Sequence, residues 1–184
     1  LVYLCRHFGL PEVADYWESV VALNTWQQRR IARLVVEKLF GTVTGKRLAI
    51  LGFAFKANTN DTREAPAIRI CRDLLEEGAQ LAIHDPKVAA HQIARDLQQE
   101  AAPQADALSG TGSWAEAGSV EDAVKGADAV LVLTEWQEYG DLNWMALAGQ
   151  MRKPAWVFDS RAITDHEQVR AAGLTCWCVG DGEG

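Results

Sequence analysis

The strongest constraint on the fold is a short apolar run, Arg47–Leu51, that is followed at once by a single glycine, Gly52, and a long polar loop. Beyond the loop the sequence takes on a helical pattern. A strand, a glycine turn and a helix form the front of a nucleotide-binding α/β unit. The pattern G-x-G-x-x-G does not occur in the sequence, so this loop cannot wrap a pyrophosphate in backbone amides as tightly as a three-glycine loop. It carries Lys56 and Arg63 instead, and both cations suit phosphate.

Beyond residue 46, apolar runs of strand length alternate with helical patterns. Continuous apolar strands separated by helices indicate a parallel sheet that is covered on both faces. We therefore predict an α/β fold built on a doubly wound parallel sheet, Rossmann-like in type. The expected strands are 47–52, 80–84, 128–133, 155–159 and 174–179, and the expected helices are 65–77, 87–99, 119–125, 142–151 and 165–172. Residues 100–118 are rich in Ala, Gly, Ser and Gln without a period, which predicts a mobile loop or an insertion.

Residues 11–40 have a separate helical pattern. Pro11 fits the first turn of a helix, and Gly41 fits its end. The segment is either one long helix or two helices with a break near Asn24. Its apolar stripe is too long to be buried by one small sheet domain, so we expect residues 1–40 to form a helical segment distinct from an α/β domain at 41–184.

Composition excludes several classes of function. The 184 residues carry a formal net charge of −7 and show no basic stripe, which disfavours nucleic-acid binding. No apolar run approaches the roughly 20 residues of a membrane span, and the first residues show no targeting pattern. The four cysteines are scattered, which is typical of a reduced cytosolic protein rather than a disulfide framework. Cys176 and Cys178 form a C-x-C pair, but histidines at ligand spacing are lacking, so we predict structural thiols and no metal.

Ligands of open parallel sheets lie beyond the carboxyl ends of the strands. The residues that follow the expected strands there are Phe55, Lys56, Arg63, Asp85, Thr134, Glu135, Trp136 and Arg161. Together they offer the cations and apolar surfaces that a nucleoside diphosphate requires. Each also has a plain structural alternative: Lys56 as a solvated loop residue, Arg63 as a partner of Asp61 or Glu64, and Arg161 as a partner of Asp159. Asp85 could bind a ribose hydroxyl, although an Asp-Pro pair more often caps a turn.

Several motifs occur together, in order and with consistent spacing over nearly the whole chain. They are Leu10-Pro11-Glu12-Val13-Ala14, Phe55-Lys56, Asp61-Thr62-Arg63-Glu64, Asp85-Pro86-Lys87, Thr134-Glu135-Trp136 and Phe158-Asp159-Ser160-Arg161. On these motifs the sequence resembles the C-terminal part of the UDP-glucose/GDP-mannose dehydrogenase family, and in particular its UDP-glucose 6-dehydrogenases.

The resemblance implies that a preceding Rossmann domain holds NAD and that the nucleophilic cysteine lies upstream of Leu1, so no catalytic residue is expected in this chain. The complete enzyme would oxidise UDP-glucose twice to UDP-glucuronate, using two NAD and passing through a thiohemiacetal and a thioester. This chain would bind the nucleotide and direct C6 toward the nicotinamide, and alone it would be inactive.

The resemblance also assigns roles to particular residues. Phe55, Lys56 and Arg161 would contact the sugar nucleotide, and Arg63 would reach toward NAD. Ala162 occupies a position where the family commonly has Arg or Asn, so no contact is expected from it. The helical segment 1–40 would bridge two domains and pack against a partner, which implies a cytoplasmic homodimer or higher homo-oligomer.

Two alternatives stay open at this stage. A related enzyme that acts on GDP-mannose or on a UDP-amino sugar would carry similar motifs. A non-catalytic α/β interaction module of the receiver type needs an acidic cluster with a phosphoacceptor aspartate, and Asp85 with Asp159 does not supply the full set.

Overall fold

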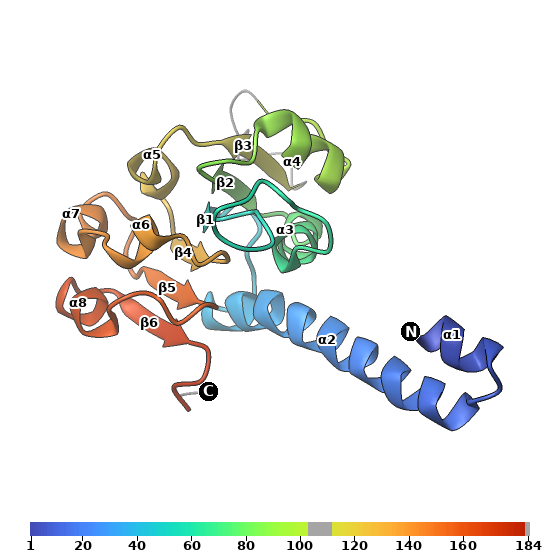
Figure 1. The fold of residues 1–184 in the computed structure, drawn as a ribbon. Helices are drawn as coiled ribbons and strands as arrows, with labels where there is room; N and C mark the ends of the chain where they lie inside the picture. The colour runs from blue at the N-terminus through green and yellow to red at the C-terminus, as the bar shows by residue number, and fades with distance from the viewer. Residues whose placement is uncertain (103–111, 183–184) are drawn as a thin grey trace.

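The computed structural model describes residues 1–102 and 112–182, and it contains a parallel sheet with helices on both sides (Figure 1). Six strands of these residues pair in the order β3-β2-β1-β4-β5-β6, and every pairing is parallel. The strands are β1 (Arg47–Leu51), β2 (Gln80–His84), β3 (Ser113–Glu116), β4 (Ala129–Val132), β5 (Trp156–Asp159) and β6 (Thr175–Cys178). The predicted α/β fold is confirmed.

The central strands are buried because helices cover both of their faces. All four residues of β4 are buried, as are Leu48–Leu51 of β1, which explains their continuous apolar sequence. The helices are α1 (Val2–His7), α2 (Pro11–Lys38), α3 (Pro66–Glu76), α4 (Ala90–Leu97), α5 (Val120–Val124), α6 (Gln137–Gly140), α7 (Trp144–Ala148) and α8 (His166–Ala171).

The order in which the chain adds strands to the sheet reverses at β1. The chain moves outward from β1 through β2 to β3, and then crosses back to β4 and continues to β6 on the other side. Right-handed crossovers place the helices of the two halves on opposite faces. Figure 1 shows α5, α7 and α8 on one side and α2 with α3 on the other, so the sheet is doubly wound as expected.

Residues 11–38 form one uninterrupted helix, so the break considered near Asn24 is absent. Pro11 occupies the first turn and Gly41 follows the end with φ of 78°. Only the C-terminal part of α2 packs on the sheet domain, through Ile31, Ala32 and Val35. Figure 1 shows the N-terminal part extending away from the sheet, with α1 folded back beside it.

The expectation of a structureless segment at 100–118 is wrong at its C-terminal end, where Ser113–Glu116 forms the edge strand β3. This strand has four residues, and its one large apolar side chain, Trp114, is almost fully buried. Residues 103–111 lie outside the described residues. No helix among the residues that the structure describes is long and apolar enough to cross a membrane.

Candidate functional site

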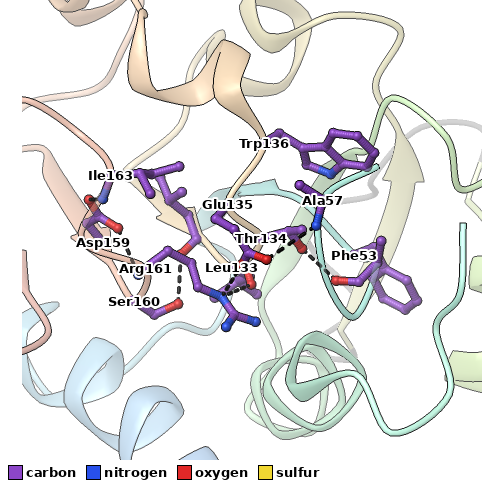
Figure 2. Close-up of polar contacts among 12 residues, drawn as sticks. Phe53, Ala57, Leu133, Thr134, Glu135, Trp136, Asp159, Ser160, Arg161 and Ile163 are labelled. Carbon is purple, nitrogen blue, oxygen red and sulfur yellow. Dashed lines mark hydrogen bonds and ion pairs between the residues drawn. The ribbon is translucent and has the colours of Figure 1, made fainter. Parts of the chain in front are cut away.

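The candidate site lies where the strand order reverses, at the carboxyl ends of β1, β4 and β5. β1 and β4 are neighbours, and the chain continues from them toward opposite ends of the sheet, so the switch point at which ligands of such sheets bind lies at their carboxyl ends. Figure 2 shows Thr134 and Glu135 between the loop after β1, with Phe53 and Ala57, and Arg161 after β5. A separate hollow of about 410 Å³ lies between α2 and α3. None of the described loops that follow the strands lines it.

Gly52 ends β1 in a conformation that requires glycine. Its φ is 93°, and an added Cβ would lie 2.4 Å from the Cβ of Thr134. The glycine therefore allows close packing of β1 against the segment after β4, which brings the two loops together.

Asp85, directly after β2, holds the loop that follows Gly52. Its Oδ2 accepts hydrogen bonds from the N–H groups of Phe53 at 2.7 Å and Ala54 at 3.0 Å. Its Oδ1 accepts from the N–H groups of Lys87 and Val88. The geometry favours the turn interpretation of Asp85 over ribose binding. It also means that the first two amides of the loop, which would bind phosphate in a glycine-rich loop, are bound to a carboxylate instead.

The segment after β4 is fixed on both sides of Glu135. Thr134 is fully buried, and its hydroxyl donates to the carbonyl of Ala54 at 2.7 Å. The indole N–H of Trp136, a residue that is 6% exposed, donates to Asp85 at 3.2 Å. Trp136 therefore supports the Asp85 turn, and the side chain of Glu135 between these anchors faces the open edge.

Phe55 and Lys56 lie at the exposed turn of the loop after β1. Phe55 is 47% exposed although it is a large apolar residue, so its ring is not part of the core. Its N–H donates to the carbonyl of Asp61 at 2.8 Å, which closes the loop. The N–H of Ala57 donates to Oε1 of Glu135 at 3.3 Å. This hydrogen bond joins the Lys56 region to the segment after β4.

Arg63 is 89% exposed and donates to both carboxylate oxygens of Asp61 at 2.7 to 3.2 Å. These hydrogen bonds lower the pKa of Asp61 to about 2. In this structure Arg63 therefore forms the ion pair with Asp61 that was the structural alternative to cofactor binding. Asp61 and Thr62 do not cap α3, because its N-cap is Ala65 without a side-chain cap bond.

Arg161 follows β5 and is tethered through one edge of its guanidinium. Its Nε donates to the carbonyl of Leu133 at 2.7 Å and lies 3.5 Å from Oε2 of Glu135 (Figure 2). The expected alternative, an ion pair with Asp159, is wrong: Asp159 binds the backbone N–H of Arg161 at 2.9 Å, and the side chain turns to Glu135. Ala162 has φ of 55°, a left-handed conformation that directs the chain away after Arg161.

Asp159 fixes the loop after β5 from inside the protein. The residue is fully buried, and its Oδ2 accepts from the N–H of Ile163 at 2.9 Å and from the N–H and hydroxyl of Thr164 at 2.8 and 2.7 Å. With the N–H of Arg161 on Oδ1, four protein donors surround one carboxylate, which satisfies a buried charge.

The C-x-C pair lies beside Asp159. Ligand atoms of Asp159, His166 and Cys178 lie within 4.8 Å of one another. Oδ2 of Asp159 already accepts three hydrogen bonds, so the carboxylate serves the loop. Burial raises the pKa of Cys176 to about 12 and that of Cys178 to about 11, and it also raises the pKa of Cys71. These thiols are therefore protonated at neutral pH, as expected of structural cysteines.

Two of the predicted ligand-binding residues, Lys56 and Arg161, lie on loops that contact the same side chain. Lys56 and Arg161 lie on loops that Glu135 links, whereas Arg63 is paired with Asp61 on the far part of its loop. The sequence pattern by itself assigns no role to Glu135 beyond its place at the end of a strand. The available signal was its place directly after a buried strand, one position from a residue that must pack against Gly52.

A Rossmann-like sheet with cations and aromatic side chains gathered at its switch point defines a nucleotide-binding α/β domain. The model for the UDP binding domain of the UDP-glucose/GDP-mannose dehydrogenase family matches residues 49–166. The chain belongs to this family.

Curated relatives extend the match along the chain. It is 43% identical over 180 residues to the UDP-glucose 6-dehydrogenase of Drosophila melanogaster, which covers 98% of this chain and 38% of that protein. It is 44% identical over 181 residues to the UDP-glucose 6-dehydrogenase of Caenorhabditis elegans, covering 98% of this chain and 37% of that protein. The chain thus spans under two fifths of the length of these relatives.

Solved structures support the fold. A UDP-glucose dehydrogenase from Pyrobaculum islandicum superposes with a TM-score of 0.69 at 23% identity, covering 96% of this chain and 34% of that chain. A UDP-D-ManNAc dehydrogenase from Pyrococcus horikoshii superposes with a TM-score of 0.67 at 23% identity, covering 96% and 34%. The overall fold described above is therefore shared with these proteins.

Proposed function

We propose that this chain is the C-terminal, UDP-sugar-binding part of an NAD-dependent UDP-glucose 6-dehydrogenase, which oxidises the C6 alcohol of UDP-glucose twice to give UDP-glucuronate. The family match and the names of the relatives support this activity. The observation that carries the binding role is Arg161, whose guanidinium is tethered at Nε beside the Lys56 loop at the switch point. Its terminal nitrogens suit the diphosphate.

Phe55, Lys56 and Arg161 are the proposed substrate contacts. The exposed ring of Phe55 offers an apolar platform, and Lys56 offers a point charge to phosphate or a hydrogen bond to the hexose. Because Asp85 occupies the amides of Phe53 and Ala54, the cationic side chains are the proposed partners of the diphosphate. Binding energy from the nucleotide would then orient C6 for oxidation.

NAD supplies the hydride acceptor when it is bound. This chain fits that cofactor at its margin only, because the G-x-G-x-x-G loop is lacking and the amides after β1 are bound internally. Arg63 is the proposed contact, since its exposed guanidinium could exchange Asp61 for a cofactor phosphate. The main NAD site and the cysteine nucleophile are assigned to a part of the enzyme that this chain does not include, in keeping with the raised pKa of three of its four thiols.

Residues 1–40 are proposed to bridge the two domains and to form a homodimer or higher homo-oligomer, and residues 41–184 to bind the UDP sugar. Large apolar side chains are exposed on the part of α2 that extends beyond the sheet, and these would be buried by a partner. They are Val13, Tyr16, Trp17, Val21, Leu23 and Trp26. The cysteine usage fits a reducing, cytoplasmic setting.

Isothermal titration calorimetry with UDP and with GDP tests the base preference, and we expect UDP to bind more tightly. GDP binding more tightly would favour a GDP-mannose enzyme instead. NADH production from UDP-glucose and NAD should be absent with this chain alone, and sustained turnover above a no-protein control would contradict the assignment.

The positions of the ligand contacts are tested by three variants. Arg161→Ala should weaken UDP binding roughly 10- to 150-fold, since a charge-assisted hydrogen bond contributes about 1.5–3 kcal/mol. Arg63→Ala should change it several-fold at most and serves as the charge-matched control. Lys56→Ala should weaken UDP-glucose more than UDP if Lys56 contacts the hexose. Equal losses for both arginines would show that the nucleotide lies elsewhere.

A further inference from the structure

Glu135 is a partly exposed acidic residue at the candidate site. It lies between Thr134 and Trp136 in the segment after β4. Its neighbours on both sides are fixed by hydrogen bonds to Ala54 and Asp85. The backbone of Glu135 is therefore held in place, although its side chain is 38% exposed. A carboxylate at this position would repel a diphosphate bound nearby, so its presence at a diphosphate site calls for a compensating function.

The two oxygens of Glu135 serve two different loops. Oε1 accepts from the N–H of Ala57 at 3.3 Å, across 78 residues of sequence, and Oε2 lies 3.5 Å from Nε of Arg161. Figure 2 shows the carboxylate between these two groups. Glu135 thus connects the loop that carries Lys56 with the loop that carries Arg161.

This contact determines which edge of the Arg161 guanidinium is free. The side-chain contacts of Arg161 with the described residues run through Nε, to Leu133 and Glu135. Figure 2 shows the two terminal nitrogens on the side away from both acceptors. A guanidinium has five donors in a fixed fork, so the terminal edge can bind a diphosphate while Nε stays tethered. Tethering also reduces the rotamer entropy that binding would cost.

We propose that Glu135 is a positioning residue for the nucleotide, an inference that rests on the proposed function. It orients Arg161 through Nε and holds the Lys56 loop beside it, and it does not contact the diphosphate. The pair contributes little to stability, because both side chains are partly exposed and solvent screens their attraction. Its effect therefore belongs to ligand affinity rather than to folding.

Glu135→Gln is the informative variant because it keeps the shape of the side chain. One amide oxygen can accept from Ala57 or from Arg161 but not from both, and the NH₂ group would face the remaining donor. We expect UDP to bind about 5- to 10-fold more weakly, which is about 1–1.4 kcal/mol. Glu138→Gln removes the same charge from the exposed surface of α6 and should stay within about twofold of the unmodified chain.

A double-mutant cycle separates positioning from a general structural role. If Glu135 acts through Arg161, then Glu135→Gln should add less than about a twofold loss in an Arg161→Ala background. Equal losses in both backgrounds, together with a lower melting temperature, would assign Glu135 a structural role and overturn the proposal. Unchanged or tighter UDP binding by Glu135→Gln would also overturn it.

NMR of arginine side chains gives a readout that needs no nucleotide. The Nε–H signal of Arg161 is identified by its loss in Arg161→Ala, and in Glu135→Gln it should shift and exchange faster with water. If the unmodified chain fails to bind UDP, the proposed function fails, and this signal still decides whether Glu135 orients Arg161. An unchanged Nε–H signal in Glu135→Gln would refute the positioning role.

Discussion

The buried carboxylate of Asp159 should be a main determinant of stability, and the change Asp159→Asn tests this. Asn has nearly the same shape, but one of its two polar atoms is a donor. Its amide oxygen can replace Oδ2 and accept from Ile163 and Thr164. The NH₂ group then faces the N–H of Arg161, which loses its acceptor.

The expected cost follows from these four contacts. Hydrogen bonds to a charged acceptor contribute about 1.5–3 kcal/mol and neutral ones about 0.5–1.5, so the three retained bonds lose roughly 1 kcal/mol each. The unsatisfied Arg161 donor costs about 1–3 kcal/mol more. Removing a fully buried charge offsets part of the sum, since an ionised group is costly to desolvate. We expect a net loss of about 2–4 kcal/mol in the free energy of unfolding.

Urea titration followed by circular dichroism measures this loss, and a thermal scan should show a melting temperature about 4–16 °C lower. Asp141→Asn, an exposed aspartate directly after α6, is the matched control and should stay within about 0.5 kcal/mol of the unmodified chain. A loss below about 1 kcal/mol for Asp159→Asn would refute the argument that the carboxylate anchors the loop after β5.

Two further outcomes are expected. Gly52→Ala should lower the free energy of unfolding in urea by more than about 3 kcal/mol, because the new methyl would lie 2.4 Å from the Cβ of Thr134. The control Gly126→Ala has φ of 70° and open space around it, so it should cost only about 1 kcal/mol of backbone strain. Similar costs for the two variants would contradict the packing argument. Burial raises the pKa of Cys176 to about 12 and of Cys178 to about 11, so alkylation by iodoacetamide at pH 8.5 should be slow in the folded chain and increase as the pH rises toward 11. Because unfolded thiols ionise near a pH of about 8.5, the free energy of unfolding should fall as the pH rises above that value. Labelling is measured by mass spectrometry, and rapid labelling at pH 8.5 would contradict the expectation by showing that the thiols are accessible and ionised.

The sequence allowed the sheet to be predicted because its central strands are continuous apolar runs. The strand expected at 80–84 is observed as Gln80–His84. The strand expected at 47–52 is one residue longer than β1 at its C-terminal end, and that expected at 128–133 is one residue longer than β4 at each end. The strand β3 escaped prediction because it has four residues at the edge of the sheet and pairs with β2 alone. The short helices α1 and α6 escaped for a similar reason, since a pattern of four to six residues shows no clear period.

The location of the candidate site was also predictable, because the carboxyl ends of parallel strands share one edge of the sheet. The partners of each side chain were not. Arg161 had Asp159 two positions before it in the sequence, yet its side chain binds Leu133 and Glu135 instead. These partners come from the segment after β4, 26 to 28 residues earlier in the chain, and no sequence period encodes such a contact.

The acidic residues of the site explain why its cations must be side chains. Asp85 binds the amides that follow β1, and Asp159 binds those that follow β5, so both strand ends have given their N–H groups to carboxylates. In a glycine-rich loop the same amides would bind phosphate. Under the proposed function, a diphosphate at this edge would therefore depend on Lys56 and Arg161. Lysine could not replace Arg161, because its ammonium has no second edge by which Leu133 and Glu135 could hold it while it binds a ligand.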